Sequence, residues 1–498
     1  MKRILIVILG VIFLNGCTMA PKYNRPGSSI PEDWPKGDAY PKAQPEANVV
    51  DATQLKWREF FIDPKLQQII QMALQNNRDL RIAVLNVERA RALYGIQRSE
   101  LFPVLDATGA LSKQRYSSDF LNPGYPKVVE QYSADLGITS WEIDFFGRIR
   151  SLTKQALEEY LSTQETRRSA QIALISEVAR AYLFIAKVET DLSLARSTLK
   201  AQEDSYNLVL RRYKASLVSE IDLQRAQTQV DTAKGDVILY TQRLAEYVNA
   251  LNFLAGAPVP KNLLPVNLDS VALFKDIFPG LSSNVLLKRP DILAAEHELK
   301  GAYANIGAAR AAFFPSISLT TALGSASSAF TNLFSAGRGT WIYNPQIVMP
   351  IFDMRTWAAY RVSRADQKIA LTKYEKTVQT AFREVADILA IQGTVEAQIA
   401  VQQSMVDSAQ KVYSLSEKRY ANGIDSYLSV LDAQRSLYRA QKELILMQLY
   451  KLSNQVQAYA ALGGGGLDDA DEGKRTSRDY LEEKALSLLD SGIRKPER

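Results

Sequence analysis

The apolar residues of this chain follow a helical period over most of its length. Between Arg148 and Lys214 there is no proline or glycine, and apolar side chains recur every three or four positions, as at Ile175, Val178 and Tyr182. This seven-residue pattern predicts a continuous helix, about 100 Å long at roughly 1.5 Å per residue, that packs as a coiled coil. A turn at residues 215–218 and a return helix over about 219–254 complete a predicted helical hairpin.

A period of two replaces the helical period just before this hairpin. Residues 104–115 and 131–145 predict a strand pair, and the segment between them holds the turn signal Asn122-Pro123-Gly124. A helix that begins at Pro64 and runs on to Glu100 is predicted before the strands. In the second strand an apolar set alternates with a polar set: Tyr132, Ala134, Leu136 and Ile138 against Ser133, Asp135, Gly137 and Thr139.

The same order of patterns occurs a second time, which indicates an internal duplication. Phe102-Pro103 returns as Phe314-Pro315, 212 positions later. The second copy predicts a helix over 291–312, strands over 315–325 and 340–352, a long helix over 355–419, a turn at 421–423 and a return helix over 426–462. Further matches all lie 207 positions apart: Arg148 and Arg355, Arg212-Tyr213 and Arg419-Tyr420, Ala226-Gln227 and Ala433-Gln434, Gly256 and Gly463.

The N-terminus has the pattern of an export signal. Met-Lys-Arg precedes the apolar stretch Ile4–Leu14, and Leu14-Asn15-Gly16-Cys17 follows. The apolar stretch is too short for a helix that crosses a bilayer of roughly 30 Å. Because the chain's single cysteine lies at the end of this stretch, we expect Cys17 to be the first residue of the mature protein and to carry covalent lipid (palmitate). An unmodified thiol in an ordinary signal peptide is the alternative.

Proline and glycine mark the boundaries of the predicted segments. Residues 18–54 are rich in proline and lack a helical period, which predicts an extended tether. The stretch from Gly256 to Pro290, with Pro290 included, holds five prolines. The expected organisation is a signal peptide (1–16), a lipidated tether (17–66), repeat 1 (67–256), a linker (257–290), repeat 2 (291–463) and a charged C-terminal tail (464–498).

The composition excludes several functions. One cysteine and one histidine, His297, rule out an internal disulfide framework, a multi-cysteine metal site and a Ser/His/Asp set, so we expect no catalysis and no cofactor apart from the lipid. The net charge of +6 is small for 498 residues and no dense basic run occurs, which favours a solvated surface of mixed charge over nucleic-acid binding. A glycosidase carboxylate pair is conceivable, but long helical seams offer no cleft for a sugar.

Four amphipathic strands per chain predict an assembly. In the second strand pair Trp341, Tyr343 and Ile347 alternate with Asn344 and Gln346, so one face suits lipid and the other a wet lumen. Open sheet edges are not tolerated in a membrane, and four strands cannot close a useful barrel. Two copies would give a filled eight-stranded barrel, whereas three would leave room for water. A sheet packed on helices in a soluble monomer is the alternative.

Together these features resemble the TolC-like outer-membrane efflux channels, in particular their lipoprotein, OprM-like branch. The resemblance covers residues 17–463. It implies a homotrimer with a 12-stranded transmembrane β-barrel in the outer membrane and an α-barrel of coiled-coil helices in the periplasm. It also implies partnership with a periplasmic adaptor and an inner-membrane resistance-nodulation-division transporter. It rests on the lipobox at Cys17 and on three motifs, Trp57 to Leu80, Trp141 to Arg148 and Leu286 to Ile292.

The resemblance also assigns roles at the two helical turns. Asp432 matches the family residue that lines the periplasmic constriction, and Tyr420 matches the tyrosine that closes it by bonding an acid, whose position Asp222 occupies. Asp425 stands where TolC has a basic residue, so we expect the closed state to differ in detail. The residues expected to contact the adaptor are Arg212, Tyr213, Ser216, Arg419 and Gly423.

Simpler structural roles remain open for these residues. Tyr213 and Tyr420 also fit the helix seam as packing residues, and Asp222 and Asp425 could cap helix N-termini. Ser216 stands where the family usually has glycine, so the first turn departs from the family pattern for adaptor docking. For the whole chain, the alternative function is a non-conducting coiled-coil lipoprotein that links envelope layers.

Overall fold

The computed structural model describes residues 18–40, 56–272 and 282–464, apart from residues 28, 118, 120–123 and 125. The expected signal peptide, Cys17 and the tail beyond Gly464 lie outside these residues, as does most of the turn signal at 122–124. The chain divides into two compact units. One unit contains the sheet and the helix ends next to it, and the other contains the helical turns and most of the helical residues.

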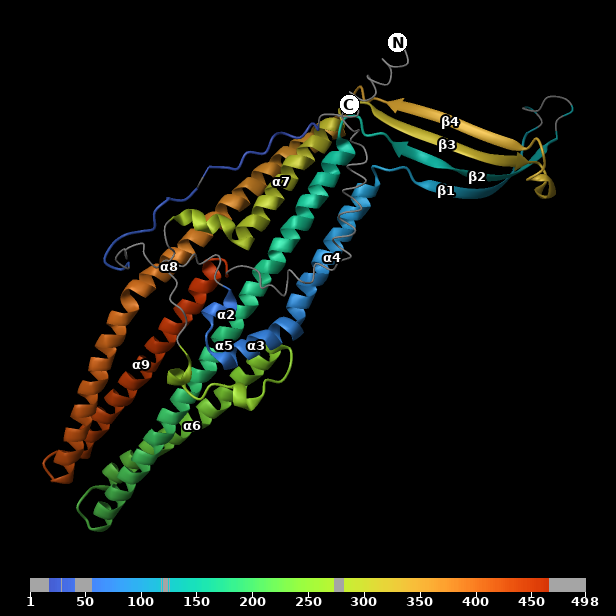
Figure 1. The fold of residues 1–498 in the computed structure, drawn as a ribbon. Helices are drawn as coiled ribbons and strands as arrows, with labels where there is room; N and C mark the ends of the chain where they lie inside the picture. The colour runs from blue at the N-terminus through green and yellow to red at the C-terminus, as the bar shows by residue number, and fades with distance from the viewer. Residues whose placement is uncertain are drawn as a thin grey trace. The chain divides into compact units, whose positions relative to one another are not determined.

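The sheet contains all four predicted strands in chain order (Figure 1). Each strand is antiparallel to its neighbour, and the pairing of β2 with β3 joins the two repeats into one sheet. The prediction of a mainly helical chain with four strands is therefore confirmed. The strands are β1 (Leu105–Arg115), β2 (Val128–Glu142), β3 (Ser316–Ser327) and β4 (Gly339–Val348).

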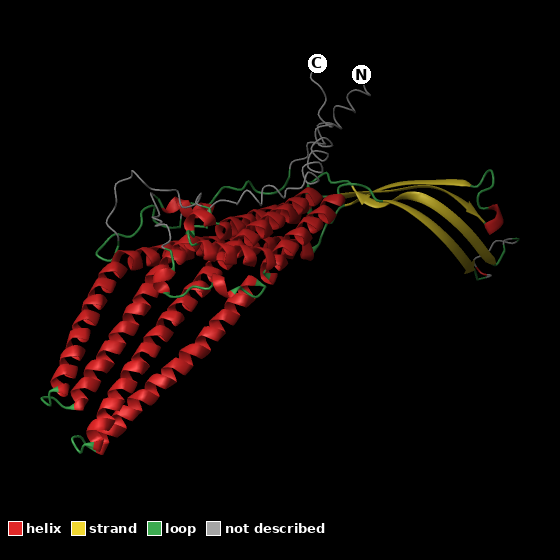
Figure 2. Cartoon of the chain, turned by 60° about the horizontal axis from the view of Figure 1, so that its bottom comes forward, coloured by secondary structure: helices red, strands yellow, loops and turns green. Residues whose placement is uncertain are grey.

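Most of the chain is helical, with two long helices and two return helices as predicted (Figure 2). Four helices contribute residues to both units: α4 (Arg78–Ser99), α5 (Arg148–Lys214), α7 (Pro290–Ala311) and α8 (Met354–Ala421). The return helices are α6 (Glu220–Ala255) and α9 (Tyr427–Ala461), and α2 (Trp57–Phe60) and α3 (Pro64–Asn76) precede α4. Short 3-10 helices are η3 (Lys261–Leu263), η4 (Leu268–Ser270), η5 (Ser283–Lys288) and η6 (Phe330–Asn332).

The predicted single helix from Pro64 to Glu100 was wrong, because the chain turns at Asn77. This residue is extended, with ψ of 130°, and its side-chain oxygen accepts a hydrogen bond from the Leu80 amide at 2.9 Å. Its side-chain nitrogen donates to the Leu254 carbonyl, also at 2.9 Å. Asparagine competes with the helix backbone in this way and is favoured as an N-cap. One side chain thus ends α3, begins α4 and contacts α6.

The motif around Trp57 closes the core of the helical unit. Phe60 and Phe61 are fully buried and pack against the Tyr459 ring at 5.1 and 5.2 Å between ring centroids. Asp63 accepts a hydrogen bond from the Lys65 amide at 2.8 Å and so caps α3. Burial of each phenylalanine stabilises the fold by about 1.5–3 kcal/mol.

The motif around Arg289 connects three helices of the same unit. The Arg289 guanidinium is buried and donates hydrogen bonds to Asp291 at 2.7 Å, Glu384 at 3.1 Å and the Ala461 carbonyl at 2.6 Å. The three acceptors belong to α7, α8 and α9. Loss of the arginine would leave two half-buried carboxylates and a helix terminus without this shared partner.

Residues 18–27 and 29–40 form an extended strap, most of whose contacts are with repeat 2. In the unit with the sheet, Arg25 and Tyr23 donate to the Glu296 carboxylate on α7 at 2.5 and 3.1 Å. The backbone at Ala20 passes so close to Gly307 that a Cβ at Gly307 would lie 2.7 Å from its nitrogen. The first part of the predicted tether is therefore held by charge pairing and by a glycine.

The rest of the strap lies on the helical unit. Trp34 stacks on Phe382 of α8 with ring centroids 5.2 Å apart. At Gly393, an added Cβ would lie 2.3 Å from the Ala39 carbonyl oxygen. Gly393 is the single glycine of the 68-residue helix α8. Its presence in an otherwise uninterrupted helix is thus explained by the close approach of the strap backbone.

Candidate functional sites at the sheet faces and helix tips

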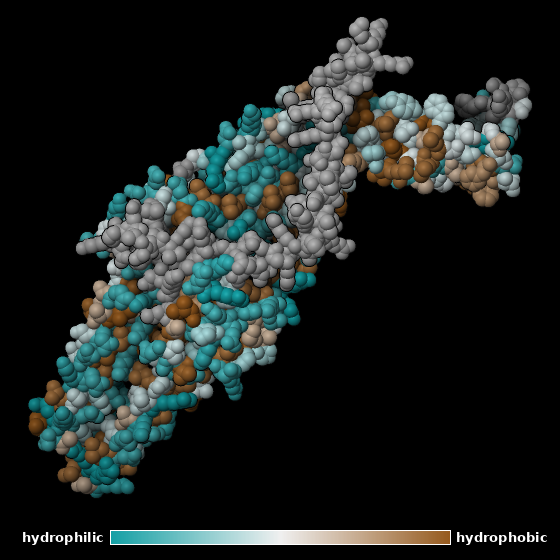
Figure 3. Space-filling view, viewed as in Figure 1, coloured by the Kyte–Doolittle hydropathy of each residue, from teal (hydrophilic) through white to brown (hydrophobic). Residues whose placement is uncertain are grey.

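The sheet has one apolar face and one polar face. The register places Leu136, Leu323 and Trp341 side by side across β2, β3 and β4 on the apolar face. These three side chains are 52, 70 and 77% exposed in the single chain. On the opposite face Asp135 lies beside Gly324, where an added Cβ would meet its carboxylate. Hydrophobic side chains gather over the sheet in Figure 3, so this chain leaves an apolar surface of the kind that contacts lipid or protein.

Both edges of the sheet are open in the single chain. The strand order is β1-β2-β3-β4, so β1 and β4 are each paired along one side only. The other side of each edge strand presents backbone N–H and C=O groups that need partners. Within a bilayer, water could not supply these partners.

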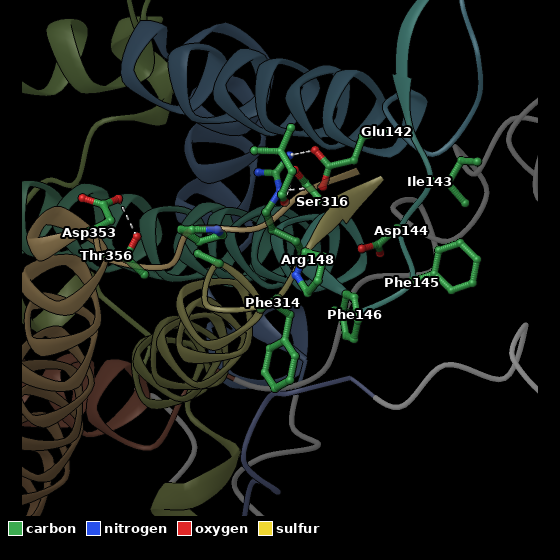
Figure 4. A pocket seen from close by; sticks show the side chains of 15 residues that line it. Glu142, Ile143, Asp144, Phe145, Phe146, Arg148, Phe314, Ser316, Asp353 and Thr356 are labelled. Carbon is green, nitrogen blue, oxygen red and sulfur yellow. Dashed lines mark hydrogen bonds and ion pairs between the residues drawn. The ribbon is translucent and has the colours of Figure 1, made fainter. Parts of the chain in front are cut away.

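A pocket of about 290 Å³ lies where the strands join the helices (Figure 4). Arg148 donates hydrogen bonds to both carboxylate oxygens of Glu142, at 2.9 and 2.7 Å. Phe146 stacks on Phe314 with ring centroids 4.9 Å apart. The motif between Trp141 and Arg148 therefore forms a structural joint, in which Glu142 is paired with Arg148 and Asp144 with Arg150.

The helical unit ends in two tips of matching backbone geometry, which lie side by side in Figures 1 and 2. We call residues 212–219 the first tip and 419–426 the second tip. At the first tip the Leu217 amide donates to the Arg212 carbonyl at 2.9 Å. At the second, the Ile424 amide donates to the Arg419 carbonyl, also at 2.9 Å. These bonds define a Schellman motif, and they recur at the 207-residue spacing seen in the sequence.

Ser216 forms the turn that glycine forms at the second tip. Its φ is 58° and that of Gly423 is 71°, both in the left-handed region. The serine therefore leaves the geometry of the first tip intact, at the cost of backbone strain. The absence of glycine therefore does not change the backbone conformation of the first tip.

The hydrogen bond expected between Tyr420 and Asp222 is not formed in this chain. Tyr420 is 7% exposed, and its hydroxyl is buried without a hydrogen-bond partner among the described residues. The Asp222 carboxylate instead accepts from the Ser219 hydroxyl at 2.9 Å and lies 3.8 Å from Arg225. Ser219, to which no role was assigned from the sequence, is the N-cap of α6, and Asp222 supports it from the first helical turn.

Asp425 does not cap α9, so that expectation was wrong. The N-cap is Ser426, and the Asp425 carboxylate accepts two hydrogen bonds from the Arg419 guanidinium, at 2.6 and 3.0 Å. These hydrogen bonds lower the pKa of Asp425. The pair closes the second tip on itself, since both residues belong to the same turn.

The remaining tip residues are exposed to solvent or contact the other repeat. Tyr213 is 38% exposed, so its expected place in the helix seam is only partly realised. Asp432 lies on the exposed side of α9, between the buried residues Leu431 and Ala433. Arg212, expected to face an adaptor, points instead to the end of α8, where it donates to two carbonyl groups. No pattern in the sequence signalled that contact.

These elements define a class of membrane protein in which an amphipathic sheet is joined to long helical hairpins. The sequence model of the family described as "Outer membrane efflux protein" matches residues 69–257 and 281–464. The chain belongs to this family. It is an outer-membrane component of an efflux pump, and it extends from the outer membrane into the periplasm.

Individual relatives support the same assignment. The toluene efflux pump outer membrane protein TtgC and the antibiotic efflux pump outer membrane protein ArpC, both of Pseudomonas putida, are each 45% identical over 466 residues, which cover 93% of this chain and 96% of the relative. The crystal structure of the open state of the Neisseria gonorrhoeae MtrE outer membrane channel has a TM-score of 0.79 and 37% identity. It covers 90% of this chain and 98% of MtrE.

Proposed function

We propose that three copies of this chain enclose one exit duct, in which twelve strands form a transmembrane barrel and twelve helices form a periplasmic tunnel. The observation that carries the proposal is the two-faced sheet with two open edges. Pairing β4 of one copy with β1 of the next satisfies both edges and turns every apolar face towards lipid. Two copies would close only eight strands, whose interior side chains fill.

The duct serves as the outer part of a tripartite pump, beside a periplasmic adaptor and an inner-membrane transporter of the resistance-nodulation-division type. Family membership supports this arrangement, and the names of the relatives above support toluene-like solvents and antibiotics as cargo. At the tips, Leu217 and Ile424 are 74 and 62% exposed at equivalent positions. Together with Tyr213, Ser216 and Gly423, they offer the adaptor an apolar surface.

Passage through the duct involves no catalysis and no cofactor. Its narrowest periplasmic part is a ring of three Asp432 carboxylates, which the exposed position of Asp432 on α9 supports. Like charges on one axis favour cations and oppose anions. The single histidine, His297, is engaged with Glu158 at 2.7 Å, which supports a structural role for it.

A covalent lipid on Cys17 anchors each copy to the outer membrane. The residues next to Cys17 support this anchor, because Thr18 lies 3.3 Å from the Ser151 hydroxyl and Met19 accepts a hydrogen bond from Arg310. These contacts lie in the unit that contains the sheet. Acyl chains would therefore be delivered close to the membrane-spanning strands.

Two matched substitutions on β4 test the barrel. Trp341 and Thr340 are neighbours on opposite faces of the sheet. We expect Trp341→Arg to reduce the amount of trimer recovered from outer membranes, because arginine on the lipid face costs about 2–4 kcal/mol at mid-bilayer. Thr340→Arg should insert normally and change the ion selectivity of single channels in planar bilayers.

The proposal fails on either of two results. Equal recovery of both variants would contradict the assignment of the faces. Pure wild-type protein of trimeric mass that never gives discrete openings would favour the alternative of a non-conducting scaffold.

A further inference from the structure

Arg212 connects the two repeats at their tips. Its guanidinium donates to the Tyr420 carbonyl at 3.2 Å and to the Ala421 carbonyl at 2.8 Å. The same group lies 4.7 Å from the centre of the Tyr420 ring. Resting on the duct proposed above, we propose that this contact, called here the tip contact, holds the periplasmic end closed. Arg212 is then a positioning residue for gating.

The end of α8 is well suited to bind an arginine. The last carbonyl groups of a helix have no partners within the helix and carry its negative partial charge. A guanidinium can donate to two such carbonyls while its flat face rests on an aromatic ring. Tyr420 and Ala421 are the last two residues of α8, and together they supply both carbonyls and the ring.

A comparison of the two tips explains why Arg212 binds the end of α8 and not a group in its own tip. Its counterpart Arg419 is held within its own tip by Asp425. The residue 207 positions before Asp425 is Val218, which packs in the apolar cluster between the tips. With no acid in its own turn, Arg212 reaches the neighbouring helix end. One acid-to-valine difference thus turns a contact within a tip into a contact between tips.

Tyr420 contributes its ring and its carbonyl to the tip contact, and not its hydroxyl. The ring contacts both the Arg212 guanidinium and the Tyr427 ring, whose centroid is 5.3 Å away. The buried hydroxyl has no partner among the described residues. Removal of an unpaired buried hydroxyl is neutral or stabilising. The tip contact therefore makes a distinctive prediction, namely that Tyr420→Phe leaves the gate closed.

The test measures the open probability of the full-length trimer in planar bilayers. We expect Arg212→Ala to raise it on the order of tenfold or more, since hydrogen bonds from a charged donor to two carbonyls are lost. Arg211→Ala is the control, because Arg211 is exposed, carries the same charge and makes no such contact in the described structure. Tyr420→Phe should match the wild type.

Arg212→Lys keeps the charge but not the paired, planar donors, so it should give an intermediate open probability and guards against a folding defect in the alanine variant. Equal values for Arg212→Ala and Arg211→Ala would overturn the proposal. So would opening by Tyr420→Phe as large as that by Arg212→Ala, or full closure by lysine. Absence of conductance in every protein would overturn the duct itself, and so is distinguishable from failure of the tip contact.

Discussion

The serine at the first tip allows backbone strain to be measured on its own. Ser216 and Gly423 occupy equivalent turns with φ of 58° and 71°. At Gly423 no atom lies within 4 Å of an added Cβ. Exchanging the two residues therefore changes the cost of the left-handed backbone without adding a clash. We expect Ser216→Gly to stabilise the first tip and Gly423→Ser to destabilise the second.

The magnitude follows from two opposing terms. A residue with a Cβ pays roughly 1–2 kcal/mol in the left-handed region. Glycine loses more chain entropy on folding, roughly 0.5–1 kcal/mol. The net gain from Ser216→Gly is then about 0.5–1 kcal/mol, or up to about a fivefold smaller opening constant for the turn.

Hydrogen exchange of single amides reports this opening. The Leu217 amide is bonded to the Arg212 carbonyl, and the Ile424 amide to the Arg419 carbonyl. In Ser216→Gly the Leu217 amide should exchange up to about five times more slowly, while the Ile424 amide serves as an internal control. Gly423→Ser should speed exchange at Ile424 by a similar factor. Unchanged or faster exchange at Leu217, with no effect of Gly423→Ser, would refute the strain argument.

Two further predictions concern the strap. Gly393→Ala should loosen the strap, because the new Cβ would approach the Ala39 carbonyl to 2.3 Å. At an overpacking cost of about 1–3 kcal/mol, trypsin should cut the strap at least several-fold faster in this variant. Gly235→Ala, at an open helix position, is the control and should not change the rate of cleavage. Burial opposes ionisation of Glu296, but hydrogen bonds from Lys300 on the same helix and from Arg25 on the strap outweigh it and lower its pKa below the usual 4.5. Strap docking should thus be complete above pH 4.5 and weaken as the pH falls through the lowered pKa of Glu296. The fluorescence anisotropy of a dye attached to the strap would record this loss. No acid-induced loss of docking, or the same loss in Glu296→Gln, would contradict the prediction.

Periodicity predicted the elements well, because each element needs one face buried. The expected helix over 148–214 is α5 with the same bounds, and the alternation of Tyr132, Leu136 and Ile138 marks one face of β2. The duplication also carried information about geometry, since both tips form the same hydrogen bonds at the same spacing. Such features are local, and a local sequence pattern is sufficient to specify them.

Contacts between distant segments were much harder to predict. The break at Asn77 depends on the Leu254 carbonyl, and the partner of Arg212 is 208 residues away in the chain. Gly393 did carry a signal, because an isolated glycine in a long helix often marks a close approach of backbone. The sequence alone could not say that the approaching backbone would be the strap at Ala39.

The duplicated halves have diverged where the chain can make a contact only once. Gly95 and Gly307 are equivalent at the spacing of 212, yet only Gly307 is covered by the strap, and Gly95 has no atom within 4 Å of an added Cβ. A chain with one N-terminus can cover only one of two equivalent helices. The tips follow the same logic, since Arg419 is satisfied by Asp425 and leaves the end of α8 to Arg212. Two hairpins with the same turn geometry thereby acquire different partners. In a trimer, the two kinds of hairpin would alternate around the duct.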